Sequence, residues 1–243
     1  MFHKFKLVIL KQNFDPGIIG FFINPFYFAR HSLAKHIKLL SSEITGKVLD
    51  IGCGTKPYKE FFNYSDYTGM EIDTPDTRKN SKVDVFYDGK TFPFEDGEFD
   101  SIVINQVLEH VFTPDEFLAE TRRVLKPGGK LLLTVPFIWD EHEQPFDYAR
   151  YSSFGLKYLL EKNGFKVTRQ YKSLDNFRLF FQLLNAYFYK KIDFHNKYIN
   201  FIMITIVTSI NNLIGVPVSM ILPRNKDLYL DNIILAQKSG DTK

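Results

Sequence analysis

Val48-Leu49-Asp50-Ile51-Gly52-Cys53-Gly54 is an apolar run that breaks directly into a glycine turn. Glycine lets a ligand approach the backbone closely, and the amides of the turn and of a following helix point toward that ligand. Asp50 would repel a pyrophosphate group here, whereas it would attract a ligand that carries an ammonium and a sulfonium group. The stretch therefore predicts a strand whose end binds a locally cationic ligand.

Two further positions separate this turn from a dinucleotide-binding turn. That pattern requires Gly or Ala three residues after its second glycine, and this chain has Pro57 there. Glu71 ends the next apolar run, where a carboxylate accepts hydrogen bonds from both ribose hydroxyls. Asp73 or Asp76 takes this role if the strand ends later. The pattern favours a nucleoside-like ligand and opposes an NAD-dependent oxidoreductase.

Short apolar runs alternate with helical or turn segments, as in βαβ units with a parallel sheet. The run at 130–135 is apolar without alternation, which is typical of a strand covered on both faces by helices. The predicted fold class is α/β, with a mostly parallel seven-stranded sheet and helices on both faces. Strands are expected at residues 47–51, 67–72, 83–87, 99–105, 130–135, 165–171 and 228–236.

Two helices can be placed closely. Thr113, Pro114 and Glu116 form an N-cap, a proline at the first helical position and a capping-box partner, which predicts a helix to about Leu125. A second helix is expected over 152–163, ended by an Asn-Gly pair.

Five motifs resemble, in their order, those of class I S-adenosylmethionine-dependent methyltransferases. The resemblance spans about residues 45–171. It implies a Rossmann-like class I methyltransferase fold, S-adenosyl-L-methionine as cofactor, and methyl transfer as the reaction. The motifs are VLDIGCGTKPY (48–58), YTGMEID (67–73), Asp88-Gly89, FPFEDGEFDSIVINQVLEHV (92–111) and RRVLKPGGKLLLTVP (122–136).

By this resemblance the glycine turn holds the methionine part of the cofactor. The acid after the second strand, Glu71, binds the ribose, and its neighbour Ile72 lies beside the adenine. The Asp-Gly pair meets the adenine amino group, and two residues after the fourth strand line the methionine end. Asp88 also fits a plain turn residue, and Lys56 replaces the family's third glycine. The predicted cofactor-binding residues are Asp50, Gly52, Cys53, Gly54, Glu71, Ile72, Asp88, Gly89, Asn105 and Gln106.

The acceptor is expected near the loops after the fourth and fifth strands, because ligands of open α/β sheets bind beyond the carboxyl ends of strands. A hydroxyl acceptor must lose its proton, and His142 or His110 is the natural base. Each also fits a structural role: His142 as an exposed loop residue, and His110 as a residue packed behind the strand.

No metal is expected. Glu109-His110 resembles part of the Glu-x-x-Glu-His site of small-RNA 2′-O-methyltransferases, but Gln106 stands at the first Glu and is a poor ligand. No nucleic-acid partner is expected either. The fourth strand continues Asn-Gln-Val-Leu in place of the Asn/Asp-Pro-Pro-aromatic motif of nucleic-acid amino methyltransferases, and the core has no strong basic patch.

The segment 142–165 resembles the loop and helix after the fifth strand in methyltransferases of bacterial polysaccharide and glycolipid assembly. It indicates O-methylation of a sugar hydroxyl on a glycan or glycolipid precursor. A small-molecule O-methyltransferase is the alternative, and a non-catalytic cofactor-binding or scaffold protein on the same fold is the alternative of another class.

The predicted organisation has an N-terminal helical, aromatic cover over 1–46 and a methyltransferase domain over 47–243, with a helical, apolar insertion at 177–226. From Tyr198 to Pro223 there is no charged residue, although Asn211, Asn212 and Pro217 interrupt the stretch. One crossing of a membrane is excluded if the strands before and after it share a sheet. A buried cover over the acceptor pocket, a homodimer face, or a hairpin in the membrane interface through 177–224 remain.

Composition and charge bear on the compartment. Apolar residues at 44% and charged residues at 24% are ordinary for a globular protein. Cys53 is the only cysteine, so no intramolecular disulfide forms, and the expected location is the cytoplasm or the inner face of the cell membrane. Residues 157–243 carry 13 Lys and Arg against 6 Asp and Glu, a basic balance that suits anionic lipid or a solvated surface.

Overall fold

The computed structural model describes residues 11–80 and 82–240, and within them the chain divides into two compact units. One unit comprises 11–35 with 172–230, and the other comprises 36–171 with 231–240. The helix α3 (Tyr27–Leu40) contributes to both. Of the predicted N-terminal cover, residues 1–10 lie outside the described residues.

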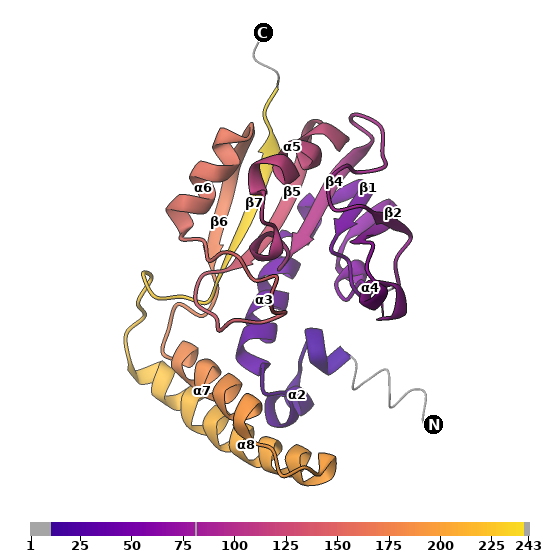
Figure 1. The fold of residues 1–243 in the computed structure, drawn as a ribbon. Coiled ribbons are helices and arrows are strands. Elements are labelled where there is room, and N and C mark those ends of the chain that lie inside the picture. The colour runs from indigo at the N-terminus through magenta and orange to yellow at the C-terminus, as the bar shows by residue number, and fades with distance from the viewer. Residues whose placement is uncertain (1–10, 81, 241–243) are drawn as a thin grey trace. The chain divides into compact units, whose positions relative to one another are not determined.

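The larger unit is built on a seven-stranded sheet in the order β3-β2-β1-β4-β5-β7-β6 (Figure 1). The neighbours from β3 to β5 are parallel, and β7 is antiparallel to β5. This confirms the mostly parallel α/β fold. The strands are β1 (Thr45–Ile51), β2 (Asn63–Ile72), β3 (Val85–Tyr87), β4 (Phe99–Asn105), β5 (Leu125–Pro136), β6 (Phe165–Lys172) and β7 (Asp231–Lys238).

Every predicted strand exists, and the differences lie at strand ends. β2 begins at Asn63, four residues before the apolar run, because polar residues continue the parallel pairing with β1. β7 begins at Asp231, after Tyr229 and Leu230, whose side chains are buried outside the ladder. Apolar patterning marks the buried part of a strand, and the hydrogen-bonded ladder sets its ends.

Helices α4 (Pro75–Asn80), α5 (Pro114–Val124) and α6 (Ser153–Lys162) belong to this unit. Ser152 caps α6 by accepting a hydrogen bond from the Gly155 amide. The predicted Thr113 cap is wrong, because no side-chain cap bond forms at the start of α5, which relies on proline at its first turn. The helix expected after the glycine turn is also wrong: within 52–62, all described, only the 3-10 turn Lys59–Phe61 forms.

A single apolar core fills the sheet unit. It is formed by the inner side chains of β1, β4, β5 and β7 with those of α5 and α6. Leu118 and Val124 of α5 and Leu156 and Leu160 of α6 are each 0% exposed. Since the strands of the sheet centre are buried in this core, the carboxyl ends of β1 and β4 are held in fixed register.

The second unit contains α2 (Ile18–Ile23), the first turns of α3, and the hairpin of α7 (Arg178–Lys191) and α8 (Lys197–Ile221), whose two helices lie side by side (Figure 1). Buried amides hold it together. Asn212 donates to the Phe21 carbonyl and accepts from Asn185, and Gln182 bonds the backbone at Pro25 and Ala29. The asparagines that interrupt the uncharged stretch therefore attach α8 to its neighbours.

The apolar surface of α8 is largely unburied. Only 17% of its most apolar window is buried, and α8 is the one helix of the described residues that is long and apolar enough to cross a membrane. The three expected roles of this segment, a cover over the acceptor pocket, a homodimer face and a membrane-interface hairpin, stay predictions. The strands on either side, β6 and β7, are neighbours in the sheet. They run antiparallel, since Gly164 bonds Ser239 and Thr168 bonds Leu235.

Candidate functional site

The glycine turn after β1 has the backbone that only glycine adopts readily. Gly52 has φ +68, and a Cβ there would lie 2.3 Å from Val107 Cγ2. Gly54 has φ +48, and no described heavy atom lies within 4 Å of its Cβ position. Lys56, which replaces the family's third glycine, also takes a left-handed conformation (φ 55). Its ammonium group pairs with Asp84, so the turn keeps its shape at a cost in strain.

Asp50 lies directly below this turn in a buried position. It is 5% exposed, and its Oδ2 accepts a hydrogen bond from the Tyr67 hydroxyl at 2.7 Å. Burial raises the pKa of Asp50 to about 7, even though the Tyr67 hydrogen bond favours the ionised form. A cation placed over the turn would favour the ionised form further. Tyr67 was not identified from the sequence, where it reads only as a β2 core residue.

Glu71 at the end of β2 turns toward the glycine turn. Its Oε1 accepts a hydrogen bond from the Gly54 amide at 2.7 Å, and burial raises its pKa. Ile72 beside it is exposed, and a Cβ on Gly89 would lie 3.1 Å from Ile72 Cδ1. The structure therefore brings the predicted ribose and adenine residues to one edge of the sheet.

Asp73, an alternative ribose ligand, and Asp88, predicted to meet the adenine, have partners within the chain. Asp73 binds the Arg78 guanidinium, with Nη2 at 2.6 Å. Asp88 Oδ1 accepts from the Thr91 and Lys90 amides, and these backbone hydrogen bonds lower its pKa. Asp88 thus stabilises its own turn, and its contact with adenine stays a prediction.

Asn105 and Gln106 follow β4. Gln106 has φ 54, a strained value for a residue with a side chain. Its amide N–H donates to the Thr134 carbonyl, and its side-chain Nε2 to Thr134 Oγ1 at 3.3 Å. Asn105 Oδ1 accepts from the same hydroxyl at 3.2 Å. Cys53 is buried, which raises its pKa to about 12 and keeps it a thiol.

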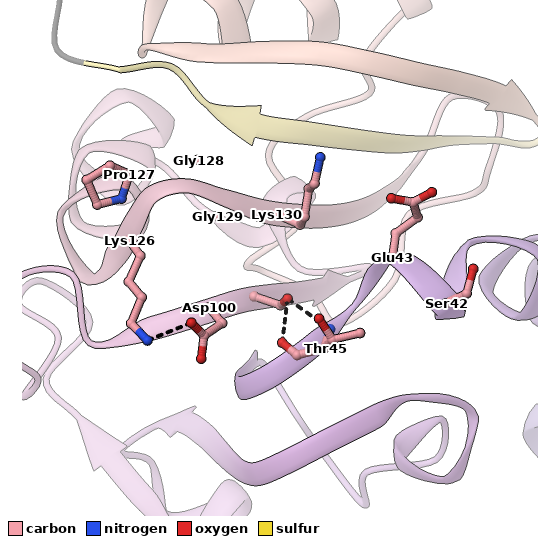
Figure 2. Close-up of a pocket in the computed structure, with 10 residues that line it drawn as sticks. Ser42, Glu43, Thr45, Asp100, Lys126, Pro127, Gly128, Gly129 and Lys130 are labelled. Carbon is pink, nitrogen blue, oxygen red and sulfur yellow. Dashed lines mark hydrogen bonds and ion pairs between the residues drawn. The ribbon is translucent and has the colours of Figure 1, made fainter.

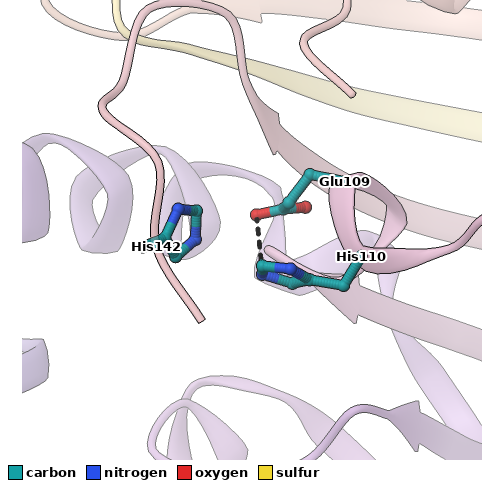
Figure 3. Close-up of side chains that lie close together, drawn as sticks. All are labelled: Glu109, His110 and His142. Atoms are coloured by element: carbon teal, nitrogen blue, oxygen red, sulfur yellow. Dashed lines mark ion pairs between the residues drawn. The ribbon is translucent and has the colours of Figure 1, made fainter. Parts of the chain in front are cut away.

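Glu109, His110 and His142 gather where β4 and β5 end (Figure 3). Their ligand-type atoms all lie within 4.8 Å of one another. His110 Nε2 lies 3.9 Å from Glu109 Oε1, and the two imidazole rings meet edge to face at 4.8 Å. Glu109 is fully buried, and burial raises its pKa to about 8. Both predicted base candidates are in this cluster.

The loop after β5 orients both imidazoles. His110 Nδ1 bonds the Phe146 carbonyl at 2.8 Å. His142 Nδ1 lies 3.2 Å from Asp147 Oδ2, and Asp147 is held by two Arg150 nitrogens at 2.6 Å each. The Arg150 hydrogen bonds keep the pKa of Asp147 well below its usual range. His142 is thus no free loop residue, and its partner Asp147 gave no recognisable signal in the sequence.

A hollow at the opposite edge of the sheet does not belong to this site. Its walls come from the amino ends of β1, β4 and β5, where Thr45 bonds Ser101 and Asp100 pairs with Lys126 at 2.6 Å (Figure 2). Ligands of open α/β sheets bind at the carboxyl ends, so the glycine turn and the Glu109–His110–His142 cluster define the candidate site.

Comparison with known proteins agrees with this geometry. Residues 49–133 match the family model described as a methyltransferase domain. A demethylmenaquinone methyltransferase of Renibacterium salmoninarum is 34% identical over 97 residues, which cover 36% of this chain and 40% of that protein. A Mycolicibacterium smegmatis protein named as a probable S-adenosylmethionine-dependent methyltransferase is 26% identical over 160 residues, covering 58% and 60%.

The fold comparison extends over most of the chain. The crystal structure of an S-adenosylmethionine-dependent methyltransferase from Archaeoglobus fulgidus matches with a TM-score of 0.54 at 17% identity, covering 91% of this chain and all of that one. Both sequence relatives are matched over less than two thirds of their own length. The similarity therefore establishes the domain and the fold.

Proposed function

Because the chain belongs by fold and domain to the class I S-adenosylmethionine-dependent methyltransferases, we propose that it transfers the cofactor's methyl group to a sugar hydroxyl of a glycan or glycolipid precursor. The observation that carries this proposal is the cluster of two oriented imidazoles and a buried carboxylate beyond β4 and β5. A hydroxyl needs such groups because its proton must leave during transfer.

The residues of the chain have separate roles in this reaction. S-adenosylmethionine supplies the methyl group as a sulfonium. Asp50 below the turn favours the cationic methionine end, and Glu71 binds the ribose and stays anchored to the Gly54 amide. The acceptor oxygen attacks the methyl carbon, the carbon–sulfur bond breaks with its electron pair left on sulfur, and the proton passes to His142 or His110. Alignment and exclusion of water supply most of the acceleration.

A lipid-linked acceptor is supported by the surface of the helical unit. Exposed apolar side chains recur along α8 at helical spacing, at Phe201, Ile202, Ile206, Ile210, Leu213, Ile214, Met220 and Ile221. Residues 177–224 carry five Lys and Arg and one acid, Asp193. An apolar helical surface with flanking basic residues suits the interface of an anionic membrane. We place the α7–α8 hairpin there, on the cytoplasmic face.

Vesicle flotation tests the membrane contact. The wild-type chain is expected to float with phosphatidylglycerol vesicles and to float less with phosphatidylcholine alone. Ile206→Glu with Ile210→Glu should abolish flotation. Both positions are exposed, so the two glutamates would place negative charges in the apolar surface. Phe154→Glu, at a still more exposed apolar position on α6, is the control. No flotation of the wild type would remove the membrane contact, and a concentration-dependent dimer in sedimentation would favour a homodimer face.

Methyl transfer from radiolabelled cofactor tests the activity. Label is expected in lipid-linked or nucleotide-linked sugars, and His142→Ala should lose transfer while it retains cofactor binding. Labelling of small phenols alone would favour the small-molecule O-methyltransferase. Cofactor binding without any labelled product would favour a non-catalytic protein. Quinols belong in the panel because one relative is named a demethylmenaquinone methyltransferase.

A further inference from the structure

Glu109, in the short turn after β4, has a buried carboxyl group whose oxygens the described residues leave without hydrogen bonds. The residue is 0% exposed, and neither of its carboxylate oxygens has a hydrogen-bond partner among the described residues. His110 Nε2, at 3.9 Å, is too distant for a hydrogen bond. A buried carboxylate without partners is costly, and protonation would still leave its two oxygens unpaired. A group from outside the chain is needed beside these oxygens.

Each of the two imidazoles has one ring nitrogen engaged with oxygen and keeps the other available as a ligand. In each ring Nδ1 faces an oxygen: the Phe146 carbonyl for His110, and the Asp147 carboxylate and Asp140 carbonyl for His142. A ring nitrogen that donates to oxygen fixes the tautomer and leaves Nε2 as a lone pair. Histidines that bind metals are oriented in this way by carboxylates and carbonyls.

We infer that Glu109, His110 and His142 bind a divalent transition-metal ion through one carboxylate oxygen and two imidazole nitrogens. The ligand-type atoms lie within 4.8 Å of one another. Two ligands about 2.1 Å from one ion are about 3 to 3.4 Å apart in a tetrahedral or facial site, so side-chain movements on the order of 1 to 2 Å complete the set. Two histidines and a carboxylate suit ions such as Zn²⁺, Mn²⁺ or Fe²⁺, with positions left open.

This inference reverses the expectation from the sequence. That expectation discounted a metal because Gln106 stands where a Glu ligand would be. In the structure the Gln106 amide bonds Thr134, and the third ligand comes from the loop after β5 as His142. His110 and His142 are partly exposed, which gives an ion a path into the site.

The ion would also define the acceptor more narrowly, a consequence that rests on the proposed function. Open coordination positions suit an acceptor with two neighbouring oxygens, such as a vicinal diol of a sugar. The bound hydroxyl becomes more acidic and releases its proton to water, and its oxygen then attacks the methyl carbon as the carbon–sulfur bond breaks. The imidazoles then hold the ion and do not accept the proton.

Metal binding is measured without cofactor or acceptor, on chelator-treated full-length protein. Zn²⁺ affinity is determined by competition with a chromophoric chelator, and Mn²⁺ occupancy by electron paramagnetic resonance. The wild type is expected to bind one equivalent. Glu109→Gln and His142→Ala should each weaken Zn²⁺ binding at least about tenfold. His195→Ala, at an exposed histidine beside Asp193, is the matched control and should bind as the wild type does.

Two results would overturn the inference: no stoichiometric binding of either ion by the wild type, or unchanged affinity in His142→Ala, a loop variant that should fold normally. Methyl transfer to sugars that survives both chelation and Glu109→Gln would overturn the ion's part in the reaction while leaving the proposed function in place. Stoichiometric binding without transfer to any sugar would instead leave the metal site in place and refute the proposed function.

Discussion

Asp50 couples cofactor binding to pH. Burial raises its pKa to about 7, so the free protein takes up a proton there below neutrality. A cationic ligand over the glycine turn requires the ionised form, and binding must then expel this proton. With a pKa near 7, affinity for S-adenosylmethionine should fall about 90-fold from pH 8 to pH 5, or ~2.7 kcal/mol.

Titration calorimetry over this range, in buffers of different ionisation enthalpy, measures both the affinity and the proton released. Asp50→Asn keeps the size of the side chain and should show weaker binding with a much smaller pH dependence. The free energy of unfolding of the free protein should fall as pH rises, whereas the affinity for the cofactor should rise. A carboxyl whose folded pKa is raised stabilises the fold below its unfolded pKa, and this contribution is lost as pH rises through 7. Affinity that is constant from pH 5 to 8, or an unchanged slope in Asp50→Asn, would refute the reasoning.

Three further substitutions test the packing described above. Gly52→Ala places a Cβ 2.3 Å from Val107 Cγ2 at φ +68 and should weaken cofactor binding at least about tenfold in calorimetry. Tyr67→Phe removes the hydrogen bond to ionised Asp50, so the pH at which affinity rises should move up by about one unit. Asn212→Ala leaves two buried groups unpaired and should lower the free energy of unfolding by roughly 3 kcal/mol in urea titrations.

Matched controls separate these effects from general damage. Gly240→Ala, where no described heavy atom lies within 4 Å of the Cβ position, should bind cofactor normally. Ser219→Ala removes a partly buried hydroxyl of the same helix as Asn212 and should cost less stability. Equal losses in the control and test variants would contradict the assignments.

Local sequence patterns predicted most of the sheet. Apolar runs located the strands, most clearly β4 and β5, where burial on both faces requires them. The glycine turn was correct because its positive φ values need glycine. The two compact units could not be predicted in this way. The helical unit is held together by hydrogen bonds such as Asn212 to Phe21, which join positions 191 residues apart.

The site was predictable only in part. The predicted cofactor residues came from the motif resemblance and from their places after strands, and parallel register brings strand ends together. The meeting of His110 with His142 depends instead on the path of the loop after β5. That path is set by backbone bonds from Tyr148 and Ala149 to the Glu109 carbonyl, which no residue pattern reveals.

The central claim is that the methyl donor lies along the carboxyl ends of β1 and β2 with its sulfur toward the cluster. A crystal structure with S-adenosylhomocysteine tests it most directly. In that structure we expect the ribose hydroxyls to bind Glu71 and the amino acid part of the ligand to lie over Gly52 and Gly54. Its sulfur should face His110 and His142. Density for the nucleoside at another edge of the sheet, or ribose without contact to Glu71, would contradict it.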